Sequence, residues 1–171
     1  APFAYAGSVT WPCALSEFVD IARTFRTLRG LWGVDLTVHG GSGCDVFEVN
    51  PRYPASVEVV ELATGVSAIL PTVTNRPRPA MRVGKAIYYA PHRLTFPASG
   101  PWDDALTHAA DVWRRPDFAD IPHPGDAIEP GQPVLTILTD ADTEADCLRR
   151  LQSRARELDA LFGVPPPEEP P

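Results

Sequence analysis

Hydrophobic and polar residues alternate most regularly in the stretch from Leu31 to Gly65. Two segments there have a period of two: Val34, Leu36 and Val38 alternate with Asp35, Thr37 and His39, and Phe47 and Val49 alternate with Val46, Glu48 and Asn50. A glycine-rich run at residues 40–43 separates them. This pattern predicts a β-hairpin with one apolar and one polar face.

The register of this hairpin decides which polar side chains meet. A hairpin that is symmetric about Gly41 and Ser42 places Asp35 opposite Glu48, and Asn50 follows Glu48 on the same face. Opposed side chains have Cβ atoms ~5 Å apart, and like charges there are destabilising. A divalent cation relieves that repulsion, and such oxygen ligands suit Mg²⁺ or Mn²⁺ with phosphates completing the shell. The alternative from spacing alone is a solvated face.

Arg52 follows directly after this predicted strand. The sequence Asn50-Pro51-Arg52 ends the strand in a turn and places a guanidinium a few residues from the carboxylates. Arginine suits bidentate recognition of phosphate or carboxylate. The arginine therefore adds an anion-binding group beside the predicted metal ligands.

These residues carry a resemblance to a known family. GVDLTV, then FEVNPR with thirteen residues from Asp35 to Glu48, then a helix ending in ATG, resembles the C-terminal half of an ATP-grasp domain. YAGSVTWP at 5–12 resembles the preceding strand in several ATP-grasp ligases. The resemblance implies that Asp35, Glu48 and Asn50 hold the Mg²⁺ ions that bridge the ATP phosphates. It implies that Arg52 contacts phosphate or the acyl-phosphate intermediate.

The resemblance also implies a fold and its boundaries. We expect an α+β fold, an antiparallel sheet with packed helices, in which a C-terminal ATP-grasp subdomain is followed by a small β-rich segment and a terminal helix. The expected regions are a core portion with the metal-binding hairpin (1–79), a β-rich appendage with the C-terminal helix packed on the core (80–163) and a disordered proline-rich tail (164–171). The family's lysine-bearing nucleotide clamp lies upstream of the matched strand, so we expect the N-terminal half of the ligase to precede this chain.

The same periodicities predict the remaining elements. We expect an extended segment at 5–10 and strands at 81–89, 94–96 and 133–139. We expect helices at 14–29, after Ser56, at 102–113 and after a cap at Asp142 or Thr143. Ser56 and Gly65 would cap the second helix. The expected apolar stripes are Leu15, Phe18, Ala22 and Phe25 in the first helix, Val57, Val60 and Ala63 in the second, and Leu148, Leu151, Ala155, Leu158 and Phe162 in the last.

Several other polar residues are weaker candidates for a site. Glu58 and Glu61 suit the positive end of their helix, with contact to a substrate amine as the alternative. Arg76 and Arg78 stand in a loop that we expect to be solvated, with binding of a substrate carboxylate as the alternative. The remaining candidates each have a structural explanation that we favour: Lys85 at a strand edge, His92, the turn-rich Asp117–Asp126 with His123, and the arginines 23, 26, 29, 149, 150, 154 and 156.

Composition narrows the functional classes. The net charge of −7 over 171 residues argues against a nucleic-acid role, because phosphate backbones bind basic surfaces. No stretch approaches the ~20 apolar residues of a membrane span, and the N-terminal sequence does not resemble a signal peptide. Cys13, Cys44 and Cys147 are widely spaced, which indicates reduced thiols of a cytoplasmic protein.

The sequence therefore predicts an enzyme of ATP-grasp type. By the resemblance, ATP with Mg²⁺ or Mn²⁺ phosphorylates a small-molecule carboxylate, and an amine or similar nucleophile captures the acyl phosphate. Two alternatives stay open: a non-catalytic fragment that serves as a binding or oligomerisation module, and a metal-dependent hydrolase that uses the same carboxylates. A homo-oligomer is compatible with the sequence, and no membrane or nucleic-acid partner is expected.

Overall fold

The computed structural model describes residues 5–11, 16–39, 43–70, 81–110 and 114–164. They fall into two compact units, which we call the sheet unit (residues 1–10 and 78–171) and the hairpin unit (residues 11–77). The described elements give an α+β chain with antiparallel sheets and four helices, as the sequence predicted. Leu15, Cys13, Arg76, Arg78 and the tail beyond residue 164 lie outside the described residues.

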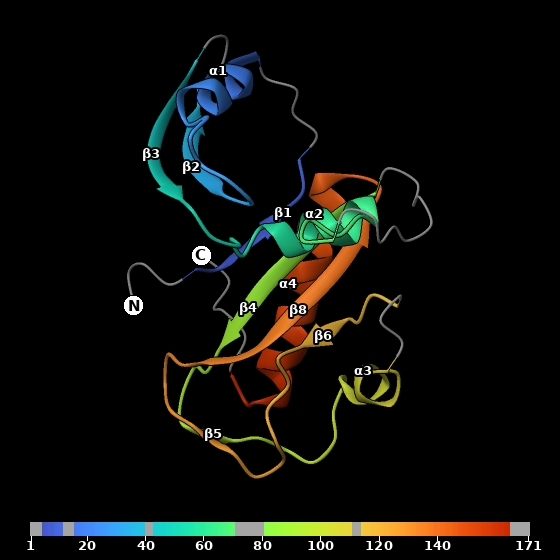
Figure 1. Ribbon diagram of the computed structural model, residues 1–171. Coiled ribbons are helices and arrows are strands. Elements are labelled where there is room, and N and C mark those ends of the chain that lie inside the picture. Colours follow the sequence, from blue (N-terminus) through green and yellow to red (C-terminus); the bar gives the residue numbers. More distant parts are fainter. Residues whose placement is uncertain (1–4, 12–15, 40–42, 71–80, 111–113, 165–171) are drawn as a thin grey trace. The chain divides into compact units, whose positions relative to one another are not determined.

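A four-stranded antiparallel sheet organises the sheet unit. Its strand order is β1-β4-β8-β6 (Figure 1). A separate pair, β5 and β7, belongs to the same unit. The strands are β1 (Gly7–Val9), β4 (Arg82–Tyr89), β5 (Leu94–Thr95), β6 (Phe118–Ala119), β7 (Ala127–Ile128) and β8 (Pro133–Ala141). The predicted strands at 81–89, 94–96 and 133–139 are thus confirmed. Of the predicted helix at 102–113, a short α3 (Asp103–Thr107) forms in the described part.

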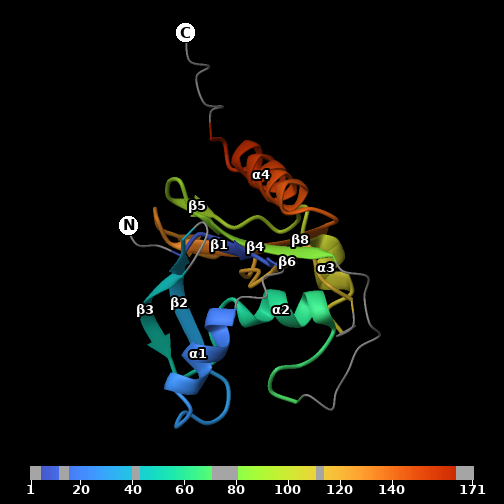
Figure 2. The ribbon, with the colours of Figure 1, turned by 90° about the horizontal axis from the view of Figure 1, so that it is seen from above.

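The long helix α4 (Glu144–Leu161) covers one face of this sheet and packs on β4 and β8 (Figure 2). Of the two predicted caps, Asp142 and Thr143, the structure has Thr143: its side-chain oxygen accepts a hydrogen bond from the Asp146 N–H at 3.1 Å. The buried side chains of α4 are Cys147, Leu151 and Leu158. The predicted Leu148 is 43% exposed, so the buried stripe begins one residue earlier than expected.

A glycine lets α4 approach the sheet closely. A Cβ at Gly84 of β4 would lie 2.6 Å from the Cys147 Sγ and 2.9 Å from the Leu151 Cδ1. These two helix side chains therefore occupy the space above the glycine. The Cys147 thiol is fully buried there, and burial raises its pKa. The cysteine is accordingly a packing residue with an unreactive thiol.

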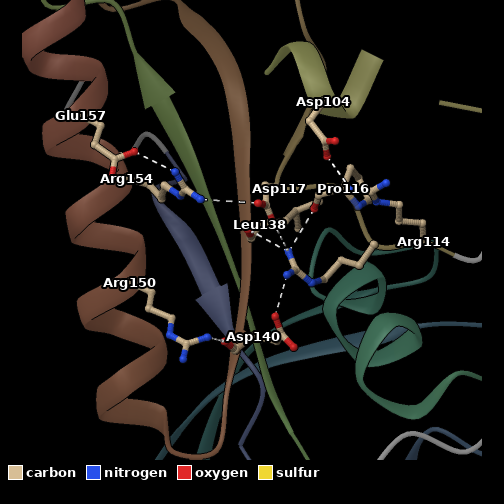
Figure 3. Close-up of polar contacts among 10 residues, drawn as sticks. Asp104, Arg114, Pro116, Asp117, Leu138, Asp140, Arg150, Arg154 and Glu157 are labelled. Atoms are coloured by element: carbon tan, nitrogen blue, oxygen red, sulfur yellow. Dashed lines mark hydrogen bonds and ion pairs between the residues drawn. The ribbon is translucent and has the colours of Figure 1, made fainter. Parts of the chain in front are cut away.

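Arginine side chains bond the main chain of β8 beyond the residues that pair with β6. Arg115 donates to the main-chain oxygens of Leu138 and Pro116, and its other amino group bonds Asp140 at 2.6 Å. From α4, Arg154 reaches Asp117 and Glu157, and Arg150 donates to the main-chain oxygen of Asp140 (Figure 3). The network satisfies strand carbonyls that no neighbouring strand pairs.

The hairpin unit is built from four elements of its own. They are α1 (Ser16–Thr24), β2 (Gly33–Val38), β3 (Cys44–Asn50) and α2 (Val57–Thr64). Helix α1 ends earlier than the predicted 14–29, and turns follow to Gly30, which has φ 78°. The half-buried residues on and after α1 are Ile21, Phe25 and Leu28. The predicted stripe was wrong at Phe18, which is 38% exposed, and at Ala22, which is also exposed.

Helix α2 differs from its prediction at the start and agrees at the end. Ser56 occupies the N-cap position but makes no side-chain capping bond, because its backbone is already helical at φ −73° and ψ −18°. Gly65 ends the helix in the left-handed region at φ 70°, as expected. The predicted stripe was wrong at Val60, which is 49% exposed, and Val59 is the buried residue.

Candidate functional site

The polar face of the β2–β3 hairpin brings the predicted ligands together. In the antiparallel register, Asp35 lies directly opposite Glu48 and Gly33 lies opposite Asn50. The Asn50 side-chain amide donates to the Asp35 carboxylate at 3.2 Å. Two carboxylates and an amide from neighbouring strands therefore share one surface. The expected pairing of Asp35 with Glu48 is confirmed.

A bulge changes the hairpin beyond this pair. The register shifts between Asp35 and Leu36, so that Leu36 pairs with Val46 and Phe47 has no partner on β2. The prediction that Phe47 belongs to the apolar face was wrong: its side chain is 73% exposed. Because the extra residue reverses the alternation, Asp45 lies opposite Thr37 and joins the face of Asp35 and Glu48.

The turn after β3 places Arg52 close in sequence to these ligands. The Arg52 N–H donates to the Asn50 oxygen at 2.8 Å across Pro51, which closes a tight turn. Gly33 allows this turn to fold back, because a Cβ there would lie 2.8 Å from the Pro54 Cγ. Arg52 is exposed, and its guanidinium forms no ion pair or hydrogen bond with another residue of the described ranges. It is available to an anion.

The carboxylates are likewise uncompensated by basic side chains. Within the described part of the chain, neither Asp35 nor Glu48 forms an ion pair, and both are exposed. Asp35 also borders a pocket of about 530 Å³ whose other lining residues are apolar, namely Phe18, Ile21, Trp32, Val34 and Leu36. A negative surface without a protein counter-ion is suited to a divalent cation.

The protein alone does not supply a complete coordination shell. Among the described residues, no group of three or more His, Cys, Asp or Glu side chains is arranged to hold a metal ion. Asp35 and Glu48 with the Asn50 oxygen would give three ligands if the amide turned its oxygen toward the ion. Mg²⁺ is commonly held by one or two carboxylates, with water and substrate phosphates in the other positions. The donor set fits that kind of shared site.

Comparisons with known proteins show a likeness of fold. No family model matches the chain, and no curated protein matches its sequence. The structure is similar to that of an L-amino acid ligase from Bacillus licheniformis, with a TM-score of 0.54 and 19% sequence identity. The match covers 92% of this chain and 43% of the ligase chain, so the chain spans less than half the length of that protein. At this identity the likeness concerns the fold.

The two acids of α2 both interact with other residues of the protein. The Glu61 carboxylate accepts hydrogen bonds from the Tyr53 hydroxyl, the Ser67 hydroxyl and the Ala68 N–H. Glu58 also interacts with other residues and contributes to raising the pKa of Tyr53. The described contacts therefore favour the structural explanation for Glu61 over contact with a substrate amine.

The weaker candidates in the sheet unit lie in local networks as well. Asp126 accepts a hydrogen bond from the His123 N–H at 2.9 Å, and Asp120 accepts one from the Thr136 hydroxyl at 2.6 Å. Asp117 is paired with Arg115 and Arg154. Lys85 also has a partner. No helix of the described ranges is long and apolar enough to cross a membrane.

Sequence reasoning missed one pair on the hairpin face. His39 Nε2 and Asp45 Oδ2 are 2.8 Å apart, beside the Gly-rich turn. Their positions on either side of that turn were a signal, but a symmetric hairpin places Asp45 opposite Val38. The bulge at Phe47 is what moves Asp45 to the polar face.

Proposed function

We propose that this chain is part of an ATP-dependent ligase of ATP-grasp type. The enzyme would activate a small-molecule carboxylate as an acyl phosphate and join it to an amine or similar nucleophile, in a cytoplasmic setting. The observation that carries the proposal is the direct opposition of Asp35 and Glu48, with Asn50 bonded to Asp35, on one hairpin face. The fold likeness to an L-amino acid ligase gives that arrangement its context.

The proposed chemistry divides the work among few residues. Asp35, Glu48 and Asn50 would hold Mg²⁺ or Mn²⁺, which neutralises negative charge on the phosphates during transfer. Arg52 would contact the transferred phosphoryl group or the acyl phosphate, where a planar guanidinium can donate two parallel hydrogen bonds. Because phosphoryl transfer needs positioning and charge stabilisation, this chain needs no covalent nucleophile for the step.

The balance of the reaction defines the substrates. A carboxylate oxygen attacks the terminal phosphorus of ATP, and ADP leaves. The amine then attacks the acyl carbon, phosphate leaves, and the amine proton passes to solvent or a base. The carboxylate and amine are small molecules in this proposal, and their identity is left to the substrate screen that would follow a positive binding result.

Calorimetric titration of Mn²⁺ into the full chain tests the proposal. We expect binding that tightens in the presence of ADP and is lost in Asp35→Asn. Asp20→Asn is the matched control, because Asp20 is an exposed acid of the same unit that pairs with Arg23. Mn²⁺ binding that ADP leaves unchanged would favour a metal-dependent hydrolase, and absence of binding in the chain would overturn the site.

A further inference from the structure

Three hydrogen-bond donors from two segments converge on the carboxylate of Glu61. The Tyr53 hydroxyl donates to Oε2 at 2.5 Å, and the Ala68 N–H donates to Oε1 at 2.6 Å. The Ser67 hydroxyl also donates to Oε1, at 3.3 Å. Both carboxylate oxygens are therefore engaged by the protein itself. Hydrogen bonds to an ionised carboxylate are roughly twice as strong as neutral ones.

These donors come from the two sides of α2. Tyr53 directly follows Arg52 in the turn after β3. The next residue, Pro54, lies close to Gly33. Ser67 and Ala68 lie just beyond Gly65, where the helix ends. Ser67 also accepts the Leu70 N–H at 3.1 Å, which extends the network to Leu70. Glu61 thus joins the segment that enters α2 to the segment that leaves it.

The state of Tyr53 is consistent with a lasting bond. Burial and then the hydrogen bond to Glu61 raise the pKa of Tyr53 well above its ordinary value. The phenol accordingly stays protonated and keeps donating throughout the neutral range. Three of the roughly four acceptor positions of the Glu61 carboxylate are already occupied by the protein, which favours an anchoring role for Glu61 over contact with a substrate amine.

We propose that Glu61 is a positioning residue, which couples the turn carrying Arg52 to the segment Val66–Leu70 through Tyr53. That Arg52 binds an anion rests on the proposed function. The coupling between the two segments does not depend on it. Where Arg52 holds a phosphate, the fixed turn restricts the guanidinium, and by linkage the bound phosphate steadies Val66–Leu70. Binding of an anion at Arg52 would therefore also reduce the motion of the segment after α2.

Hydrogen–deuterium exchange tests the coupling without a ligand. Tyr53 does not bond Ala68 directly, yet Tyr53→Phe is expected to speed exchange of the Ala68 and Leu70 amides about two- to tenfold, the size of one hydrogen bond. Tyr88→Phe is the matched control, because it removes a tyrosine–carboxylate bond to Asp159 in the sheet unit. Unchanged exchange at Ala68 in a folded Tyr53→Phe variant would overturn the proposal.

A second measurement separates this proposal from the proposed function. In Tyr53→Phe and Glu61→Gln, Mn²⁺ alone should bind as in the unmodified chain, while the tightening by ADP falls about threefold or more. If ADP tightened Mn²⁺ binding in both variants as much as in the unmodified chain, Arg52 would not take part in the coupling. A chain that binds no Mn²⁺ or ADP would end the ligase proposal, and the exchange experiment would still decide whether Glu61 couples the two segments.

Discussion

The two units of the chain use their sequences differently. Of the buried hydrophobic side chains in the described residues, all but Val59 belong to the sheet unit. The hairpin unit exposes large apolar side chains such as Phe47 and Val19. It also carries Asp35 and Glu48, two exposed acids that form no ion pair with any residue that the structure describes. Residues of the sheet unit mainly build a packed core, whereas residues of the hairpin face mainly present polar groups at the surface.

One interaction occurs in both units and shows the same contrast. Tyr88 is 7% exposed and donates to Asp159 at 2.9 Å, while its ring stacks on Phe162 of the core. Tyr53 is 40% exposed and donates to Glu61 beside the candidate site. A tyrosine–carboxylate bond therefore supports a core in one unit and positions a turn in the other. Its surroundings determine its role.

The largest expected effect comes from the core of the sheet unit. Leu158 is fully buried in α4, and Leu158→Ala should lower the free energy of unfolding by about 2–5 kcal/mol through lost burial and a residual cavity. Leu161→Ala is the control on the same helix, since Leu161 is 46% exposed. Urea denaturation followed by tryptophan fluorescence measures both. Equal losses in the two variants would refute the assigned packing of α4.

An intermediate effect should depend on alkaline pH. Burial and the bond to Asp159 raise the pKa of Tyr88 above its ordinary value near 10. Below pH ~10 the tyrosine is protonated in both states, so its contribution is fully present; above that pH the unfolded chain releases the proton first and stability falls. Tyr88→Phe should cost about 1 kcal/mol at pH 8 and show a shallower decline from pH 10 to 11. Parallel declines in urea titrations would contradict this.

The sequence predicted the fold best where a single local rule decides the structure. The strands at β4 and β8, the Thr143 cap and the Gly65 terminus follow from alternation, capping and glycine chemistry. The buried faces of the helices were less predictable, because they depend on packing partners. At Gly84, for instance, the missing Cβ leaves space for Cys147 beside the predicted Leu151, and the local pattern of α4 does not show that Cys147 points inward.

The candidate site was predictable up to the bulge. Symmetric pairing gave the opposition of Asp35 and Glu48 and the approach of Asn50. The extra residue at Phe47 shifts the pairing of the three positions of β3 that precede it, from Cys44 to Val46, and so exchanges their faces. Period-two reasoning cannot foresee that change. The Glu61 network was missed for a different reason. Its donors lie before and after α2 and meet only when the chain folds around the helix, and one of them is a backbone N–H.

The smallest effect concerns the hairpin itself and would sharpen the contrast between the units. Glu48→Gln removes one of two like charges that face each other across the strands. Without metal, the variant should be more stable by about 0.2–1 kcal/mol, since directly opposed carboxylates repel. Exchange of the β2 and β3 amides, measured without metal, reports that local gain, with Asp20→Asn as the charge-matched control.

The same variant should lose Mn²⁺ binding, because a neutral amide replaces one of the two anionic ligands. A hairpin that gains stability as it loses metal would show that its polar face is maintained for binding at the expense of folding. The two substitutions proposed in the sheet unit, Leu158→Ala and Tyr88→Phe, remove favourable contacts and relieve no repulsion, so both are expected only to destabilise. If Glu48→Gln instead destabilised the hairpin, the two acids would already be accommodated by their surroundings, and the repulsion that motivates the metal site would be absent.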